Sequence, residues 1–334
     1  DRYKCFIFPT PSQSENIPHG RNLRNMIKKT LYFGNPAYLS FNNGQLVLRL
    51  PEVEKNDSVS TAFKQKAERT IPVEDIGVLL LDHRQITITH ALLAALLDNN
   101  CAVITCDDSH LPTGLMLPLC GNATQSERFR DQIEASLPLR KQLWQQTVQA
   151  KIANQAALLH RLGVENRNML KWVNEVRSGD TDNMEARAAV YYWDNLFPGI
   201  PYFRRKRDGV PPNNLLNYGY AILRAVVARV LVTSGLLPTL GIHHHNRYNA
   251  YCLADDIMEP YRPYVDHMVC ELLDERIDIS RLSTSTKARL LALPTTEVCI
   301  GGQRSPLMIA VAQTTASLYK CFSGELRKII YPEM

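Results

Sequence analysis

The sequence lacks several patterns by which common classes of protein are recognised. None of its eight cysteines forms a Cys-x-x-Cys pair, which argues against a zinc ribbon and against a thioredoxin-type redox site. The cysteines stand singly, some inside apolar runs such as 100–104, as is typical of buried free thiols in a reducing compartment. The P-loop, the Gly-x-Gly-x-x-Gly fingerprint and the Gly-x-Ser-x-Gly elbow are absent too. The commonest nucleotide-binding and hydrolase signatures are therefore missing.

Long uncharged hydrophobic runs are also missing. The most apolar stretch, 221–240, contains Arg224 and Arg229, and a lipid-facing helix rarely carries two such charges. The amino terminus shows no uninterrupted apolar core of a secretory signal. We therefore predict a cytoplasmic protein. Its formal net charge of +5 is compatible with a nucleic-acid partner but does not by itself indicate one.

Hydrophobic patterning divides the 334 residues into a polar start, a β-rich part and a helical part. Residues 1–25 are polar and aperiodic, and we predict that they form a poorly ordered extension. Short strand-like runs with an Asn-Gly turn signal at 43–44 predict a small β-rich domain over 26–115. The strands are expected at 30–33, 38–41, 45–50, 70–72, 76–81 and 102–105, with a short helix at 90–97.

The remainder has helical periodicity and is expected to form a larger all-α domain over 125–334. Its apolar residues recur at the helical period from 139 to 162, for example. Further helices are expected at 167–177, 183–196, 213–234, 255–276, 282–292 and 305–329. Strands first and helices afterwards predict an α+β protein with two segregated domains.

A turn-rich loop at 178–183 leads into the helix that carries Glu185 in its first turn. Asp182 and Glu185 have the spacing of a capping box, which would give both residues a structural role. A carboxylate at this position could equally face a hard cation. The spacing alone leaves the two interpretations open.

Three consecutive histidines, His243, His244 and His245, follow a break between two helices. A single histidine is usually structural, but three in one loop favour metal binding or proton transfer. The pattern does not select one of them.

Three carboxylates, those of Asp255, Asp256 and Glu259, come next. On a helix Asp256 and Glu259 would share a face, and such close anions repel unless a cation compensates them. That cation could be a metal, or Arg262 in a purely structural arrangement. Prolines 260 and 263 disturb the helix, so the shared face requires them to lie in first turns or at a kink.

Two further features of the helical part could contact a substrate. The first is a polar stripe on the helix 213–234, which could line a substrate site or cap neighbouring helices. It consists of Asn213, Asn217, Tyr220 and Arg224. The second is a basic run, usually a solvated surface but here well placed to grip phosphates. It consists of Arg204, Arg205, Lys206 and Arg207.

Six segments in this order resemble the family of CRISPR adaptation integrases, the CRISPR-associated endonucleases that catalyse spacer acquisition. They are LYFGNP at 31–36, IPVEDIG at 71–77, DNMEARAA at 182–189, NYGY at 217–220, LGIHH at 240–244 and LADDIMEPYRP at 253–263. The form of the last two resembles the branch that accompanies a single-protein, RNA-guided effector nuclease, the type II systems.

The resemblance implies a metal site made by Glu185, His244 and Glu259. The family's histidine stands three residues after a glycine, which selects His244 and leaves His243 as the alternative if the register is shifted by one. Glu259 stands where several other branches carry aspartate, and it keeps an oxygen ligand. Asp256 matches a family acidic position and is expected to support the site or to act as an auxiliary ligand. The implied ion is Mg²⁺ or Mn²⁺.

The implied activity is the insertion of DNA fragments into a CRISPR array by transesterification, with a 3′-hydroxyl as the attacking group. The implied partners are double-stranded DNA, a second copy of the chain bound through the β-rich domain, a small second adaptation protein and the type II effector nuclease. The proposed DNA contacts are Arg204, Arg205, Lys206, Arg207, Asn217, Tyr220 and Arg224. Two other classes stay open: a nuclease that only hydrolyses DNA, and a catalytically silent DNA-binding scaffold.

Overall fold

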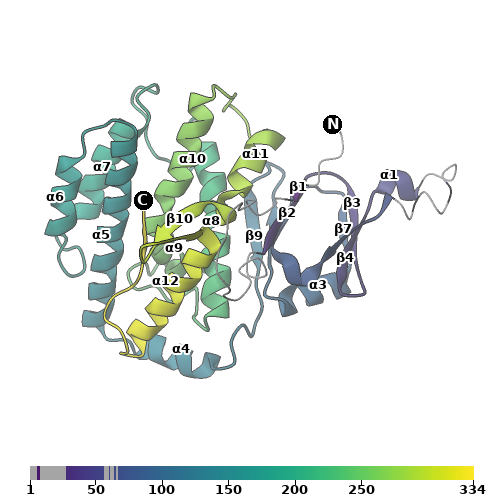
Figure 1. The fold of residues 1–334 in the computed structure, drawn as a ribbon, viewed down its shortest axis with the longest axis horizontal. Helices are drawn as coiled ribbons and strands as arrows, with labels where there is room; N and C mark the ends of the chain where they lie inside the picture. The colour runs from purple at the N-terminus through teal and green to yellow at the C-terminus, as the bar shows by residue number, and fades with distance from the viewer. Residues whose placement is uncertain (1–5, 8–27, 56–59, 61–63, 65–66) are drawn as a thin grey trace. The chain divides into compact units, whose positions relative to one another are not determined.

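The computed structural model describes residues 6–7, 28–55, 60, 64 and 67–334 (Figure 1). The chain divides into two compact units, Asp1–Leu119 and Cys120–Met334. Most of the extension predicted at 1–25 lies outside the described residues. Its residues Phe6–Ile7 form strand β1, which pairs with the strand that contains Leu31 and Tyr32. The poorly ordered extension predicted at 1–25 thus contains at least this short strand.

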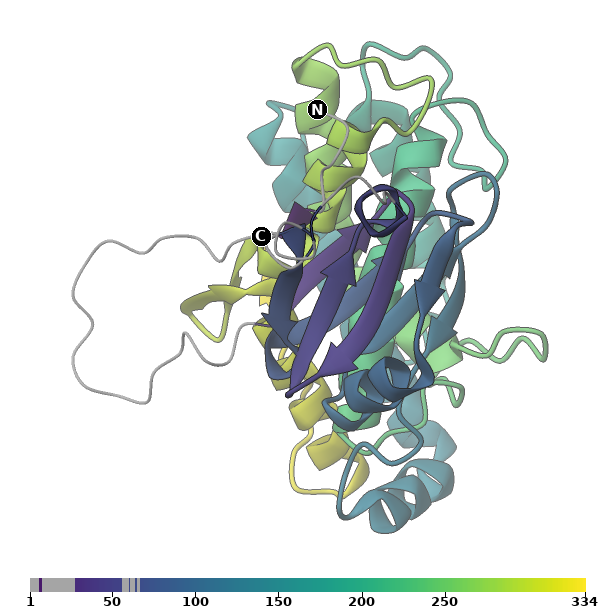
Figure 2. The same cartoon turned by 90° about the vertical axis from the view of Figure 1, so that its right-hand side faces the viewer.

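The described residues of the first unit form two β-sheets and short helices, as Figure 2 shows. The five-stranded sheet has the order β1-β2-β6-β8-β9, and its strands β2, β6 and β8 run parallel. Beyond β1, these strands are Lys29–Phe33, Ile76–Leu81, Ala102–Cys106 and Pro112–Met116. The four-stranded sheet has the order β5-β4-β3-β7. Its strands are Arg69–Pro72, Gln45–Arg49, Ala37–Asn42 and Ile86–Ile88.

The hydrophobic core of this unit draws side chains from both sheets and from helix α3, His90–Asp98. The short helices α1, Pro51–Glu54, and η2, Val73–Asp75, connect strands. The predicted hairpin is confirmed: Asn43 and Gly44 have φ angles of 47° and 75° and join β3 to β4. The six predicted strands and the helix are present. Strands β7 and β9 were missed because one is three residues long and the other contains Pro112 and Gly114.

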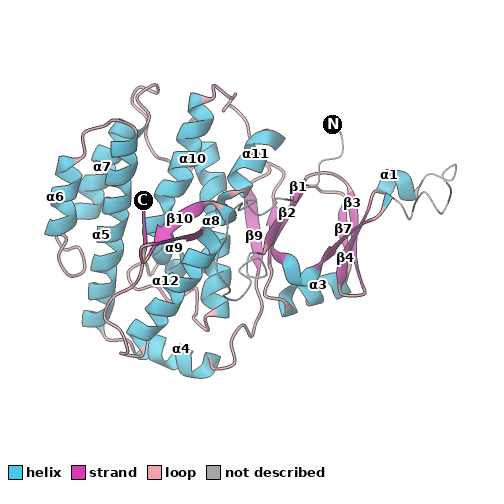
Figure 3. Ribbon diagram, viewed as in Figure 1, coloured by secondary structure: helices cyan, strands magenta, loops and turns pink. Residues whose placement is uncertain are grey.

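The second unit consists mostly of helices (Figure 3). The longer ones are α4 Gln125–Glu134, α5 Leu137–Arg161, α6 Arg167–Glu175, α7 Met184–Leu196, α8 Asn213–Thr233, α10 Arg262–Asp274 and α12 Leu307–Phe322. The shorter ones are α9 Cys252–Met258, η3 Glu259–Tyr261, α11 Thr284–Leu291 and η4 Leu293–Thr295.

Two predictions for this unit are wrong. It is not all helical, because β10 Glu297–Ile300, β11 Gln303–Pro306 and β12 Pro332–Glu333 form a small sheet. The turn between β10 and β11 uses two glycines with positive φ angles, a hairpin signal that the sequence carried. The helix expected at 255–276 is broken into α9, η3 and α10, since the prolines lie in the first turns of η3 and α10. The prolines thus meet the condition set for a shared acidic face, but the carboxylates of Asp256 and Glu259 contact different partners.

Helix α8 is long and apolar enough to cross a membrane by composition, but 72% of that apolar window is buried inside the protein. It is therefore a core helix. A Cβ on Gly219 would lie 2.4 Å from Val265 Cγ1, so the glycine permits α8 to pack closely on α10. The seven described cysteines are free thiols, as expected, but only four of them are buried: Cys106 and Cys299 are partly exposed and Cys120 is exposed.

Candidate metal centre

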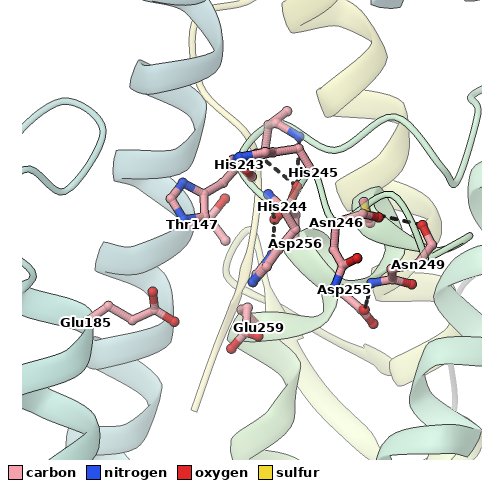
Figure 4. Close-up of polar contacts among 12 residues, drawn as sticks. Thr147, Glu185, His243, His244, His245, Asn246, Asn249, Asp255, Asp256 and Glu259 are labelled. Carbon is pink, nitrogen blue, oxygen red and sulfur yellow. Dashed lines mark hydrogen bonds and ion pairs between the residues drawn. The ribbon is translucent and has the colours of Figure 1, made fainter.

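Three separate elements of the helical unit bring Glu185, His244 and Glu259 together. Glu185 lies in the first turn of α7, His244 in the loop between α8 and α9, and Glu259 at the first position of η3. Figure 4 shows the two carboxylates and the imidazole of His244 directed toward the same space. These residues lie up to 74 positions apart in the sequence, so their meeting is a property of the fold.

A lysine that the sequence analysis missed lies between the two glutamates. Lys151 Nζ lies 2.5 Å from Glu185 Oε1 and 2.6 Å from Glu259 Oε2. Lys151 is only 8% exposed and lies on the buried face of α5. Burial lowers its pKa, but attraction by Glu259 and Glu185 outweighs burial and raises the pKa above its ordinary value. The sequence carried one signal for this contact: Lys151 lies three positions after Val148, on the apolar face of a predicted helix, where a charged residue needs a partner.

Glu259 is almost completely buried and has a second cationic neighbour, Arg262, at 3.0 Å. Burial raises the pKa of the Glu259 carboxyl, but Arg262 and Lys151 together hold it below its usual value. Arg262 thus compensates Glu259, as the structural interpretation proposed. It does not serve all three carboxylates, because Asp255 pairs with Arg224 at 2.6 Å.

Asp256 holds the histidine loop instead of facing the two glutamates. Its carboxylate accepts hydrogen bonds from the backbone N–H groups of Ile242, His243 and His244 at 2.7, 3.1 and 3.2 Å. It also bonds Nδ1 of His244 at 2.5 Å, and this contact raises the pKa of the imidazole. The arrangement leaves Nε2 of His244 as the nitrogen available to a metal, as in carboxylate–histidine–metal triads. Asp256 therefore supports the histidine, and both of its oxygens are already used.

The structure separates the histidines that the sequence left equivalent. His243 stacks on Trp144 with the ring centroids 4.0 Å apart and the planes 4° from parallel. Burial against this ring lowers the pKa of His243. His245 is exposed and bonds the carbonyl oxygen of His243 at 2.7 Å. Of the three, His244 alone is oriented by a carboxylate.

The start of α7 is capped by Asp180, not by Asp182 as the capping-box interpretation proposed. Asp180 accepts the backbone N–H groups of Met184 and Glu185 at 2.9 and 3.0 Å. Asp182 is exposed and pairs with Arg177 at 3.3 Å. Asp180 thus fixes the backbone at Glu185, whose side chain pairs with Lys151 instead of taking part in a capping box.

The chemistry of these three side chains, rather than their present spacing, fits a divalent metal. As the side chains lie, no three His, Cys, Asp or Glu groups of the described residues are close enough to hold an ion. The ammonium of Lys151 shows, however, that the position between Glu185 and Glu259 accepts a cation. Two carboxylates and one imidazole form a mixed oxygen and nitrogen set that manganese or magnesium can use.

Comparison with known proteins identifies the family of the chain. The family model described as "CRISPR associated protein Cas1" matches residues 35–291. The chain belongs to the Cas1 family. The CRISPR-associated endonuclease Cas1 of Neisseria meningitidis serogroup C is 38% identical over 250 residues, covering 74% of this chain and 81% of that protein.

Solved structures share the fold. A casposase bound to an integration product superposes with a TM-score of 0.73 at 18% identity, covering 91% of this chain and 92% of that one. A Cas1 protein from Thermotoga maritima gives 0.68 at 17% identity, covering 91% and 100%. A chain of a Cas6-RT-Cas1–Cas2 complex gives 0.68 at 20% identity, covering 90% of this chain and 35% of that one. The order of N-terminal sheets and C-terminal helices is thus the Cas1 fold.

The polar stripe of α8 makes internal contacts in this member of the Cas1 family. Tyr220 donates to buried Asp266 at 2.5 Å, as does Tyr192 at 2.7 Å. Burial raises the pKa of Asp266 to about 6 despite these two donors. Asn217 accepts from Arg205 at 2.7 Å. The polar stripe therefore binds neighbouring segments of the protein, which is the structural alternative to lining a substrate site.

Some residues of the basic run bind other parts of the protein, and the others are exposed to solvent. Arg205 donates to Asn213 and Asn217, and its guanidinium lies 5.2 Å from the ring centroid of Tyr220. Arg204 pairs with Asp194 at 2.5 Å on the surface. Lys206 and Arg207 are exposed. Arg205 thus attaches the loop to α8, and its neighbours face solvent.

An open cavity of about 370 Å³ adjoins the histidine loop. His244 and Gly241 line it, and so do two arginines that the sequence analysis did not single out, Arg140 and Arg247. The cavity therefore has two positive charges in a wall that also contains apolar side chains such as Ile133 and Phe322.

Proposed function

We propose that this chain is a divalent-metal-dependent DNA endonuclease and integrase that inserts new spacers into a CRISPR array. The observation that carries the proposal is that Glu185 and Glu259 share one cationic partner, Lys151, while His244, oriented by Asp256, is directed toward the same space. Membership of the Cas1 family and the endonuclease name of the Neisseria relative support it. So does the likeness in fold to a casposase that is bound to an integration product.

Glu185, Glu259 and Nε2 of His244 would hold the ion, Mn²⁺ or Mg²⁺, with the nitrogen ligand suiting Mn²⁺ somewhat better. When bound, such an ion polarises a scissile phosphate and stabilises the charge that develops on it. Asp256 keeps His244 in one tautomer and one orientation. The 3′-hydroxyl of a DNA fragment attacks the phosphorus of a repeat phosphodiester and loses its proton, while the bond to the 3′-oxygen of the repeat strand breaks and that oxygen leaves as a hydroxyl. The reaction therefore requires no protein nucleophile. With water as the attacking group, the same site cuts DNA.

The proposed DNA contacts are the exposed members of the basic run and the two arginines of the cavity. Arg207→Ala should weaken DNA binding and reduce the slope of log K against log salt by about 1, as expected for one lost phosphate contact. Its thermal stability should be unchanged. Arg205→Ala is the matched comparison and should lower the melting temperature, because Asn213 and Asn217 lose their partner. Equal salt slopes for Arg207→Ala and the unaltered protein would contradict the assignment.

The proposed partners follow from the family and from the assemblies in which proteins of the same fold occur. One neighbour in fold belongs to a Cas6-RT-Cas1–Cas2 complex and another to a Cas1–DNA complex. We propose double-stranded DNA, a small second adaptation protein and a second copy of this chain as partners, and the type II effector nuclease as a further one. The proposed location is the cytoplasm.

An assay with supercoiled plasmid that bears a CRISPR repeat, a short DNA duplex and Mn²⁺ tests the function. Joined products are expected from the unaltered protein and none from Glu185→Gln. Fragments without joined products would favour a purely hydrolytic nuclease. Intact plasmid under all metal conditions would favour the scaffold and overturn the proposal. Glu271→Gln, an exposed carboxylate of α10, serves as the control and should join at the normal rate.

A further inference from the structure

The ammonium of Lys151 stands at the point where the two proposed acidic ligands meet. Its nitrogen lies within 2.6 Å of one oxygen of each glutamate. Magnesium lies about 2.0–2.1 Å from its oxygen ligands in proteins. The two carboxylates are thus arranged around a cation at distances only about 0.5 Å longer than a bound metal requires. The lysine thus occupies the position between the two proposed acidic ligands.

The charges of the site explain why a lysine is there. Glu259 is buried, and Glu185 is partly buried beside it. Two carboxylates so close would repel each other and lose hydration without a counter-charge. Lys151 and Arg262 supply one positive charge for each, so these four side chains are neutral together.

A divalent ion cannot join this arrangement while the ammonium remains. It would place two more positive charges in a group that is already neutral, in contact with the ammonium nitrogen. Like charges at such a distance inside a protein repel strongly. The four-carbon side chain of lysine is flexible, in contrast to the backbone that holds Asp256.

We propose that Lys151 is an internal counter-ion, which holds Glu185 and Glu259 together in the metal-free protein and is displaced when a divalent ion binds. The inference rests on the proposed function, because it takes these glutamates as metal ligands. It assigns Lys151 a positioning role that sets metal affinity. The binding of the ion then includes the breaking of two ion pairs, which weakens the measured affinity.

Lys151→Met tests this role, because methionine is similar in length and uncharged, and its thioether is a poor ligand for manganese. Its metal-free melting temperature should fall, since the glutamates lose their counter-ion. Its affinity for Mn²⁺, measured by calorimetric titration of the full-length protein, should rise at least about tenfold. Lys141→Met, an exposed lysine of the same helix, should alter neither quantity. An affinity for Mn²⁺ in Lys151→Met that equals or falls below the normal value would overturn the proposal.

A measurement on the unaltered protein covers the case in which Lys151→Met does not fold. Lysine acylation followed by mass spectrometry should label Lys151 slowly without metal and at least about tenfold faster with Mn²⁺. Lys141 should be labelled rapidly in both conditions. Lys287, a buried lysine of α11, should stay slow in both and so reports on general unfolding. Equal protection of Lys151 with and without bound Mn²⁺ would show that the ion does not displace it.

Failure of this inference is distinguishable from failure of the proposed function. If the unaltered protein binds Mn²⁺ and Glu185→Gln does not, the metal site stands whatever Lys151 does. If the unaltered protein binds no divalent ion, the metal site and the role of Lys151 are both overturned.

Discussion

Asp256 and Glu259 lie three residues apart and both are buried carboxylates. They are stabilised by different kinds of partner. Asp256 accepts three backbone N–H groups and one imidazole nitrogen. Glu259 is paired with the side chains Lys151 and Arg262. The first set of donors is fixed by the path of the chain, whereas the second set consists of the ends of long side chains.

This difference explains why neighbouring acids take different parts in one site. A carboxylate held by the backbone gives up its partners only if the loop unfolds, so it is suited to orient another residue. A carboxylate held by a lysine can exchange that lysine for another cation with little change in the backbone. Both carboxylates are buried. What distinguishes the supporting residue from the proposed ligand is whether its hydrogen-bond donors belong to the backbone or to long side chains.

The largest effect is expected from Glu259→Gln. The amide keeps the size of the side chain but removes the charge proposed to bind the ion, so DNA joining should fall by about 10³-fold or more. Arg262 also loses its anion and Lys151 loses one of its two, so the free energy of unfolding should fall by about 3–5 kcal/mol. The joining assay and urea denaturation measure the two effects. A joining rate within tenfold of normal would show that Glu259 is not a ligand.

Asp256→Asn should have a smaller effect on joining and a different signature. Its amide offers one oxygen acceptor where the carboxylate serves four donors, so the histidine loop loosens. We expect a 10–100-fold loss of metal affinity, typical of a residue that supports a ligand, and about 1–3 kcal/mol of stability. Saturating Mn²⁺ should restore much of the joining rate. If it does not, Asp256 is a ligand and the contrast with Glu259 disappears.

Gly241→Ala tests how closely the histidine loop approaches Asp256. A Cβ at this position would lie 2.2 Å from the carbonyl oxygen of His244 and 2.7 Å from Asp256 Oδ2. The backbone must move, which should cost about 1–3 kcal/mol, as measured by thermal unfolding. Gly199→Ala is the control, since no atom lies within 4 Å of its added Cβ. Equal melting temperatures for the two variants would show that the loop adapts freely.

The smallest effect is expected from Asp180→Ala, which removes another carboxylate held by the backbone. The helix start before Glu185 loses two hydrogen bonds, at a cost of about 1 kcal/mol. Asp182→Ala should change stability by less than about 0.5 kcal/mol, because its contact with Arg177 is on the surface. Chemical denaturation compares them. A larger loss for Asp182→Ala would restore the capping-box interpretation.

Local patterns predicted much of the fold. Alternating apolar residues and an Asn-Gly turn placed the strands of the first unit, and helical periodicity placed most helices of the second. The errors occurred where a local signal was short or competed with another. A glycine pair formed a hairpin inside a region assigned as helical, and prolines divided one predicted helix into three elements.

The candidate site, too, was predicted only as far as local sequence patterns reach. The sequence by itself determined which residue types were available, and the resemblance to a family selected Glu185, His244 and Glu259 among them. Only the tertiary structure decided which histidine is oriented, which aspartate caps α7 and which cation faces the glutamates. The physical reason is that these contacts join residues far apart in the chain, such as Lys151 and Glu259. Spacing within a segment reports which residues share a face, but not what the rest of the chain places opposite that face.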